Sequence, residues 1–483
     1  MKSVIGVLSQ KLRSRELSAT ELTRKYIEVI EKINPQINAY VHTTFDEALK
    51  NAAAADALLK AGNASPLCGI PMTLKDNIAT DGLETTCCSK ILQGFKPYYN
   101  ATAWDKLRAQ GAVLLGKTNM DEFAMGSTSE TSVYGAPSNP RNLNRVTGGS
   151  SGGGAAAVCA NLAAYAIGSD TGGSIRQPAA FCGVVGFKPT YGAVSRYGLI
   201  AYGSSLDQIG PITHSVTDAA LVYDAIKGQD AHDMTSVAVD GAPTKLTPEV
   251  KGLKIGLAEE FFDGLNPEIK AAIENTVKEY EKAGAEVVKV SIPALKLALP
   301  VYYIIACAEA SSNLGRYDGI RYGYRAQSYS SVEDMVVKTR TQGFGKEVQK
   351  RIMLGTYVLS SGYFDAYYKK ACLLRERLKA ELSQTFGKCD LLFAPTAPNT
   401  AFVKGYTGGN PIEMYLSDVC TVPVNICGLP AISLPCGVDK EGLPIGMQII
   451  GNRFADGKVL SAAYFAEAQN LSPLEDVKGG VSL

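Results

Sequence analysis

The sequence predicts a mixed α/β fold with a large β-sheet. Short apolar runs of strand length alternate with segments of helical periodicity along most of the 483 residues. Hydrophobic residues make up 46% of the chain and charged residues 20%, which permits a large core. Neither a strong linker nor an internal repeat divides the chain. We therefore expect one domain over residues 1–483, weakest at the polar stretch 228–250.

Two helices are predicted near the N-terminus. Residues 18–21 read S-A-T-E, the form of a capping box. Apolar residues follow at helical spacing, namely Leu22, Tyr26, Ile30 and Ile33. Pro35 is expected to end this helix. Residues 46–61 read as a second, Ala-rich helix.

Strands and helices alternate along the rest of the chain. The predicted strands are 69–74, 112–115, 163–167, 253–257, 286–292, 391–394, 431–435 and 445–450. The predicted helices are 152–162, 216–226 after a Ser215 cap, the segment between Asn266 and Gly284, and 456–469. Residues 228–248 are polar and unpatterned, which indicates a surface connection, and 311–340 are rich in Tyr and Arg and poorly periodic.

Composition and charge narrow the possible functions. The net charge is +1, from 48 basic and 47 acidic residues, which argues against a broad nucleic-acid surface. The 11 cysteines are scattered without C-x-x-C spacing, which indicates free buried thiols in a reducing compartment. Neither a metal site nor a secretory signal is predicted. We therefore expect a cytoplasmic protein.

Two uncharged runs raise the question of a membrane helix. Residues 146–169 contain six glycines and several polar side chains, which is too polar to span a bilayer. The run 297–308 is only 12 residues long and contains Pro300. We therefore expect no membrane-spanning segment.

Two clusters of glycine and serine predict a reaction centre. Residues 148–153 read G-G-S-S-G-G and residues 170–176 read D-T-G-G-S-I-R, with an Ala-rich segment between them. A serine hydroxyl can attack a carbonyl, and successive backbone N–H groups can stabilise the oxygen charge that develops. The simpler alternative is a pair of turns that let a helix pack closely. A phosphate-binding loop is not indicated, because neither common glycine pattern for one is present.

A proton acceptor is needed beside the serines. The three histidines, His42, His214 and His232, lie away from both clusters in sequence, which disfavours a Ser-His-Asp triad. Lys75 follows an apolar strand and is the other candidate. A lysine must be neutral to accept a proton, so its pKa must fall by about three units, a cost of about 4 kcal/mol that desolvation can supply. Alternatively, Lys75 is a surface residue at a strand end.

These residues resemble the amidase signature family. Lys75, Ser150 and Ser174 have the spacing of that family, with the serines 24 residues apart and the lysine 99 residues before the second serine. The likeness is strongest over residues 67–207, and residues 251–470 are expected to complete the sheet and the substrate pocket. The implied fold is a large mixed β-sheet flanked by helices on both faces.

The resemblance also implies a mechanism. Ser174 is the expected nucleophile, Ser150 a bridging serine held by a cis peptide bond, and Lys75 the base that draws a proton through Ser150. Attack on a carboxamide would release ammonia and leave an acyl-enzyme, which water then hydrolyses. The backbone N–H groups expected to form the oxyanion hole are those of Thr171, Gly172, Gly173 and Ser174.

Three more residues of the two clusters receive roles from the resemblance. Ser151 and Asp170 are expected to be hydrogen-bond partners behind the catalytic groups. Arg176 is expected to anchor the local structure.

Within the family, the chain is similar to the glutaminase components of tRNA-dependent amidotransferases of the GatCAB type. The segments that carry this likeness are D-E-F-A-M-G-S at 121–127, D-G-I-R-Y-G at 318–323, K-R-I-M-L-G at 350–355 and Y-L-S-D at 415–418. The substrate of those components is free glutamine. Arg351 is therefore expected to bind its α-carboxylate, Asp418 its α-amine, and Tyr302 to lie near the same pocket. Without the resemblance, each of the three would be read as a structural ion pair or a core residue.

The resemblance implies two protein partners, the B and C subunits of a heterotrimer. The B subunit would bind the charged tRNA and activate it with ATP and Mg²⁺, the C subunit would hold this chain to the B subunit, and ammonia would travel through a channel. No cofactor is expected in this chain. Two alternatives remain open, namely a free-standing amidase for another carboxamide and a non-catalytic scaffold. Whether glutamyl- or aspartyl-tRNA is served, and what Cys87 and Cys88 do, does not follow from the sequence.

Overall fold

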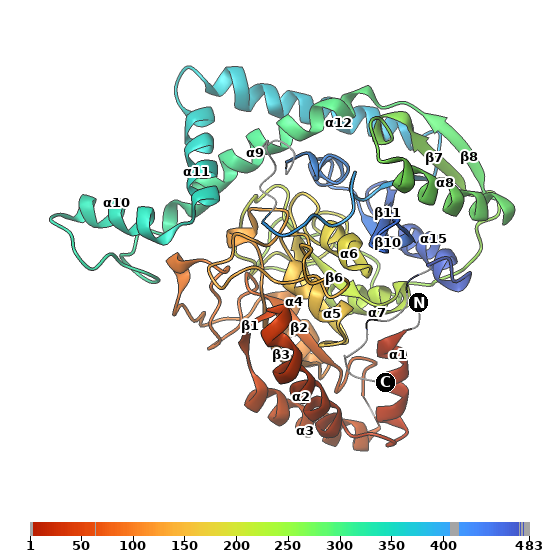
Figure 1. Ribbon diagram of the computed structural model, residues 1–483, viewed down its shortest axis with the longest axis horizontal. Coiled ribbons are helices and arrows are strands. Elements are labelled where there is room, and N and C mark those ends of the chain that lie inside the picture. Colours follow the sequence, from red (N-terminus) through yellow and green to blue (C-terminus); the bar gives the residue numbers. More distant parts are fainter. Residues whose placement is uncertain (1–2, 63, 406–414, 473, 475–476, 478–483) are drawn as a thin grey trace.

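One mixed β-sheet organises the molecule (Figure 1). The computed structural model describes residues 3–62, 64–405, 415–472, 474 and 477. Within them, eleven strands pair in the order β1-β3-β2-β4-β6-β5-β10-β11-β9-β7-β8. The strands are β1 (Tyr40–Thr43), β2 (Pro71–Lys75), β3 (Val113–Thr118), β4 (Tyr165–Asp170), β5 (Val185–Lys188), β6 (Gln208–Thr213), β7 (Lys254–Ala258), β8 (Glu286–Val290), β9 (Leu391–Pro395), β10 (Ala431–Val438) and β11 (Pro444–Gly451).

Helices cover both faces of this sheet. The α-helices are α1 (Val4–Arg13), α2 (Ala19–Ile37), α3 (Phe45–Ala61), α4 (Thr102–Ala109), α5 (Gly152–Cys159), α6 (Arg176–Cys182), α7 (Val216–Ile226), α8 (Pro267–Lys282), α9 (Ala298–Asn313), α10 (Val332–Gly343), α11 (Lys346–Leu359), α12 (Lys370–Thr385), α14 (Val422–Ile426) and α15 (Asp456–Ala468). Helices α9, α11 and α12 lie together along one side of the molecule, and α10 projects from its edge (Figure 1).

Strand β4 shows how the two layers are built. Tyr165 and Ile167 belong to the main core, which also includes residues of α2, α7 and α15. Ala166 points to the opposite face, where it packs in a smaller cluster with residues of α5 and α6. This alternation is that of a strand buried on both sides. The small side chains of α5 let it lie close to the sheet, as Gly154 against Ala166 shows. The predicted fold class is confirmed.

The parallel pair β2 and β4 positions the reaction centre. Met72 to Leu74 pair with Tyr165 to Ile167. Because the carboxyl ends of parallel strands lie at the same edge of a sheet, Lys75 at the end of β2 and the segment that follows β4 come together there.

Most predicted elements are present, with ends shifted by a few residues. All eight predicted strands and all six predicted helices have a counterpart, and residues 228–248 form no helix or strand, as predicted. Pro35 does not end α2, contrary to the prediction. The helix continues to the buried Ile37 and closes at Asn38, whose left-handed backbone places its N–H 2.7 Å from the carbonyl oxygen of Asn34.

Several elements were not predicted. Helix α9 is buried around most of its surface and therefore has no polar stripe to mark its period. Helix α10 lies within 311–340, where the sequence showed little periodicity. The other elements without a predicted counterpart are β1, β5, β6, α1, α4, α6, α11, α12 and α14. Most of these strands and several of these helices are too short for a clear period.

The helical stretch Pro293–Arg316, which includes α9, is long and apolar enough to cross a membrane by length and composition alone. However, 56% of its most apolar window is buried inside the protein. A core helix of a folded domain passes the same test, and the contacts of α9 with α11, α12 and α14 are of that kind.

Candidate active site

Lys75 lies in a closed, polar pocket at the end of β2. Its side chain is 1% exposed, and its Nζ lies 2.7 Å from Ser150 Oγ and 3.0 Å from Ser169 Oγ. Burial lowers the pKa of Lys75 to about 7, although the carboxylates of Asp121 and Asp170 oppose the shift. Close to neutral pH the amine is therefore uncharged in a large fraction of molecules and can accept a proton.

Ser150 is held by the first glycine–serine cluster, just before α5. The Gly149–Ser150 peptide bond is cis, as the resemblance implied. Glycine is needed at 149 because a Cβ there would lie 2.0 Å from Asp121 Oδ2. The Gly149 N–H also donates to Gln177 Oε1 at 2.9 Å, which ties this loop to α6.

Ser174 lies in the turn between β4 and α6 and is 7% exposed. Its carbonyl oxygen accepts a hydrogen bond from the Ser151 N–H at 3.1 Å, which joins the two clusters. Its Oγ has no hydrogen-bond partner among the described residues, Ser150 included. The second link of the expected relay, from Ser174 to Ser150, is thus open here, whereas the first link, from Ser150 to Lys75, is formed.

The expected oxyanion hole needs one correction. The Gly173 N–H donates to Asp170 Oδ1 at 2.8 Å and is therefore unavailable to a substrate oxygen. Within the described part of the chain, the N–H groups of Thr171, Gly172 and Ser174 have no acceptor. Three donors rather than four remain, because a carboxylate at the end of β4 turns back onto its own loop.

A buried ion pair holds this loop. Asp170 and Arg176 are both fully buried, with Arg176 Nε 3.1 Å from Asp170 Oδ2. Although burial by itself raises the pKa of Asp170, the Arg176 guanidinium holds it below its usual range. Arg176 also donates to Gln448 at 2.8 Å and to Asn425 at 2.6 Å. Arg176 is thus an anchor, as expected, whereas its partners in the C-terminal part were not foreseen.

Gly173 offers a test of this geometry. Its φ is +132°, and a Cβ would lie 2.3 Å from Thr421 Oγ1. We expect Gly173→Ala to lower kcat by about 100-fold, because the displaced loop misplaces its N–H donors. Hydrolysis kinetics check this. Gly315→Ala is the matched control, since a Cβ there meets nothing within 4 Å. Full activity of Gly173→Ala would contradict the assigned loop geometry.

Ser169 is a site residue that the sequence did not reveal. It accepts a hydrogen bond from Asn77 Nδ2 at 2.9 Å, and its carbonyl oxygen accepts one from Ser151 Oγ at 3.1 Å. Ser151 is therefore a partner behind the catalytic groups, as expected, through the backbone of Ser169. The available signal was a hydroxyl in an otherwise apolar strand, one residue before Asp170.

Arg351 lies on α11 among three tyrosine rings. Its side chain is buried, its Nε donates to Glu347 Oε1 at 2.8 Å, and its Nη1 donates to the Tyr202 hydroxyl at 2.6 Å. Its guanidinium carbon lies 5.2 Å from the centre of the Tyr303 ring and within 6 Å of those of Tyr202 and Tyr415. The Nη2 hydrogens have no described acceptor. They are free to bind a carboxylate.

Asp418 and Tyr302 complete this pocket. Asp418 Oδ2 accepts hydrogen bonds from Ser127 Oγ at 2.7 Å and from the Tyr303 hydroxyl at 3.3 Å. Burial raises the pKa of Asp418 to about 7. The ring of Tyr302 lies against Gly172, where a Cβ would come within 2.6 Å of it. The structure thus brings the predicted pocket residues beside the oxyanion loop.

The remaining candidates have other surroundings. His42 stacks edge-on against Tyr134, and His232 lies 3.1 Å from Asp230, so neither contacts the two serines. The described residues contain no group of three side chains that would hold a metal ion. All eleven cysteines are free thiols, as predicted, and Cys87 and Cys88 are fully buried.

Fold and site together define an enzyme that cleaves carboxamides with serine and lysine. A family model described as Amidase matches residues 21–460. The chain belongs to the amidase family.

Two curated relatives and two solved structures show where the chain lies in this family. It is 53% identical over 98% of both chains to the A subunit of glutamyl-tRNA(Gln) amidotransferase from Caldanaerobacter subterraneus, and 55% identical over 96% of both to its counterpart from Halothermothrix orenii. The crystal structure of the Thermotoga maritima counterpart is 40% identical, with a TM-score of 0.79 over 96% of this chain and 94% of that one. A peptide amidase from Stenotrophomonas maltophilia is 31% identical, with a TM-score of 0.83 over 99% and 98%.

Proposed function

We propose that this chain is the glutaminase subunit of a tRNA-dependent amidotransferase. It hydrolyses glutamine and supplies ammonia for the conversion of glutamyl-tRNA(Gln) to glutaminyl-tRNA(Gln). The observation that carries the proposal is the pocket of Arg351 and Asp418 beside Ser174. A buried cation and a buried carboxyl group suit the α-carboxylate and the α-amine of an amino acid, and a simple amide has neither. Near-complete coverage of relatives named as glutamyl-tRNA(Gln) amidotransferase components supports the same assignment.

The reaction uses the residues of the pocket as one proton relay. Neutral Lys75 accepts the proton of Ser150 as Ser150 takes that of Ser174, and Ser174 Oγ bonds to the amide carbon. The N–H groups of Thr171, Gly172 and Ser174 stabilise the charge on the carbonyl oxygen. The relay then returns a proton to the amide nitrogen, the C–N bond breaks, and ammonia leaves. Water attacks the resulting γ-glutamyl ester by the same relay and frees glutamate.

The proposed assembly follows from the name of the relatives. A lettered component of an amidotransferase has companion subunits, and we assign to these B and C subunits the charged tRNA together with ATP and Mg²⁺. This chain then needs no cofactor of its own, and its balanced charge suits a component that does not carry the main RNA contact. Conversion of aspartyl-tRNA(Asn) by the same complex, and a cytoplasmic location, belong to this proposal.

We expect Arg351→Ala to raise the KM for glutamine by about 10- to 100-fold, because the α-carboxylate loses a buried bidentate partner. Steady-state glutamine hydrolysis by the full chain, with its co-purified partners and charged tRNA present or omitted, measures this. Arg196→Ala is the matched control, since Arg196 binds Thr235 near the surface.

An unchanged KM in Arg351→Ala would contradict glutamine as the substrate. The alternatives would then remain. A free-standing amidase would hydrolyse other carboxamides without partners and without a need for Asp418. A non-catalytic scaffold would hydrolyse none.

A further inference from the structure

A short segment connects Arg351 with the oxyanion loop. This connecting segment, residues 202–207, begins at Tyr202, which is 2% exposed and accepts the hydrogen bond from Arg351 Nη1 at 2.6 Å. The Tyr202 N–H in turn donates to Asp207 Oδ2 at 2.9 Å. One residue thus contacts both the guanidinium that faces the substrate and the carboxylate at the far end of the segment.

Asp207 joins the connecting segment to the oxyanion loop. It is 2% exposed and accepts the Thr171 hydroxyl hydrogen at 2.6 Å. It also accepts the N–H groups of Tyr202 at 2.9 Å and of Gly203 at 3.1 Å. No cation forms an ion pair with it among the residues that the structure describes. Its hydrogen bonds therefore go to the connecting segment and to Thr171, whose own N–H is one of the three oxyanion donors.

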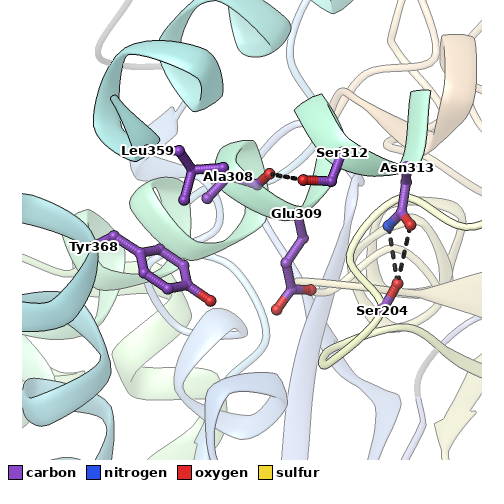
Figure 2. Close-up of a pocket in the computed structure, with 7 residues that line it drawn as sticks. All are labelled: Ser204, Ala308, Glu309, Ser312, Asn313, Leu359 and Tyr368. Carbon is purple, nitrogen blue, oxygen red and sulfur yellow. Dashed lines mark hydrogen bonds between the residues drawn. The ribbon is translucent and has the colours of Figure 1, made fainter. Parts of the chain in front are cut away.

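The outer side of the connecting segment is fixed to α9. Asn313 Nδ2 donates to Ser204 Oγ at 2.9 Å, and the Ser205 N–H donates to Glu309 at 2.9 Å. Figure 2 shows Ser204 and Asn313 facing each other at the wall of a pocket of about 200 Å³, with Glu309 beside them. A segment held on its outer side can move little, so a displacement of Tyr202 is felt at Asp207 rather than lost in the loop.

The contacts of Arg351 also decide which of its edges meets a ligand. Glu347, one helical turn before it on α11, occupies Nε, and Tyr202 occupies one hydrogen of Nη1. The edge formed by Nη1 and Nη2 remains open for the two oxygens of a carboxylate. A carboxylate bound there shares its guanidinium with Tyr202.

We propose that Tyr202 and Asp207 are positioning residues that make carboxylate binding at Arg351 act on the oxyanion loop through Thr171. An amide that carries an α-carboxylate then does more than bind. It fixes Arg351, Arg351 fixes Tyr202, and the Asp207 carboxylate holds Thr171 with its N–H toward the reacting carbonyl. The inference rests on the proposed function and deepens it, since it makes the enzyme faster for amino-acid amides than for simple ones.

Two isosteric variants break the connection at its two ends. Tyr202→Phe keeps the ring beside Arg351 but removes the hydroxyl, and Thr171→Val removes the bond to Asp207 but keeps the backbone N–H. Each is tested with glutamine and with butyramide, which has the same reacting group but no carboxylate or amine. We expect kcat for glutamine to fall about tenfold in each variant and kcat for butyramide to change less than about twofold.

The double variant decides whether the two bonds act in series. Once one link of a series is broken, breaking the other removes nothing more, so its kcat for glutamine should equal that of the single variants. Multiplied losses of about 100-fold, or equal losses for both substrates, would overturn the inference, because either result is that of independent structural roles. Ser204→Ala is the control on the outer side of the segment and should leave both substrates unaffected.

Failure of this inference is distinguishable from failure of the proposed function. If Arg351→Ala raises the KM for glutamine while Tyr202→Phe and Thr171→Val leave kcat unchanged, only the coupling is wrong. If Arg351→Ala leaves that KM unchanged, the glutamine assignment is wrong as well.

Discussion

Replacing Ser174 with alanine is expected to abolish glutamine hydrolysis, with kcat lowered on the order of 10⁴-fold or more. The hydroxyl is the only group of the site placed to bond to the substrate carbon, because Ser150 Oγ is engaged with Lys75 at 2.7 Å. Removal of one oxygen from a side chain whose Oγ has no described hydrogen-bond partner leaves the fold intact. Initial rates of ammonia release measure the effect.

A matched control separates chemistry from folding. Ser236→Ala removes another buried serine, in the polar connection after α7, and should keep full activity. Both variants should unfold within a few degrees of the parent. Substantial hydrolysis by Ser174→Ala would show that another group is the nucleophile.

Replacing Lys75 should be nearly as severe, since the relay acts as a unit. Lys75→Ala removes the proton acceptor, and Lys75→Arg replaces it with a guanidinium that stays charged. We expect both to lose on the order of 10³-fold or more in kcat. Retained activity in Lys75→Arg would mean that the positive charge matters and that the neutral amine does not.

Lys106→Met is the matched control for these variants. Lys106 is half-buried and donates to the carbonyl oxygens of Ile226 and Lys227 at 3.2 and 2.7 Å, away from the site. Its loss should affect stability more than hydrolysis. Equal loss of activity in this variant would trace the effect of Lys75 to folding.

The chemistry of the site was predictable because the residues that perform it lie in short motifs. Ser150 and Ser174 each lie among glycines that the backbone requires, so both clusters are visible in the sequence. Lys75 is marked by its place at the end of an apolar strand. Its depressed pKa was predicted as a requirement, and the surrounding burial meets it at about 7.

The support of the site was not predictable, because it is assembled from distant segments. Glu347 lies four residues before Arg351 on one helix, and that spacing was available in the sequence. Tyr202 and Asn425 meet their arginines only after the sheet has formed. The Gly173 N–H was wrongly assigned to the oxyanion hole, since spacing does not reveal where the Asp170 carboxylate turns.

The pH dependence of hydrolysis reports the same amine. Because the neutral form of Lys75 is the active one, activity should rise as pH increases through about 7 and fall below it. Asp418, with its pKa raised to about 7 by burial, must lose its proton to bind the substrate amine and adds to the same limb. The profile of kcat/KM therefore mixes two groups, and a direct titration of the lysine is needed.

The account depends most on the charge of Lys75, and NMR titration of ¹³C-labelled lysine side chains measures it directly. Burial lowers the pKa of Lys117 to about 8 and that of Lys188 to about 7 as well, so the Lys75 signal must be assigned by its loss in Lys75→Arg. We predict that this signal titrates near pH 7. A signal that stays protonated up to the usual lysine value near 10.4 would contradict the proposed relay.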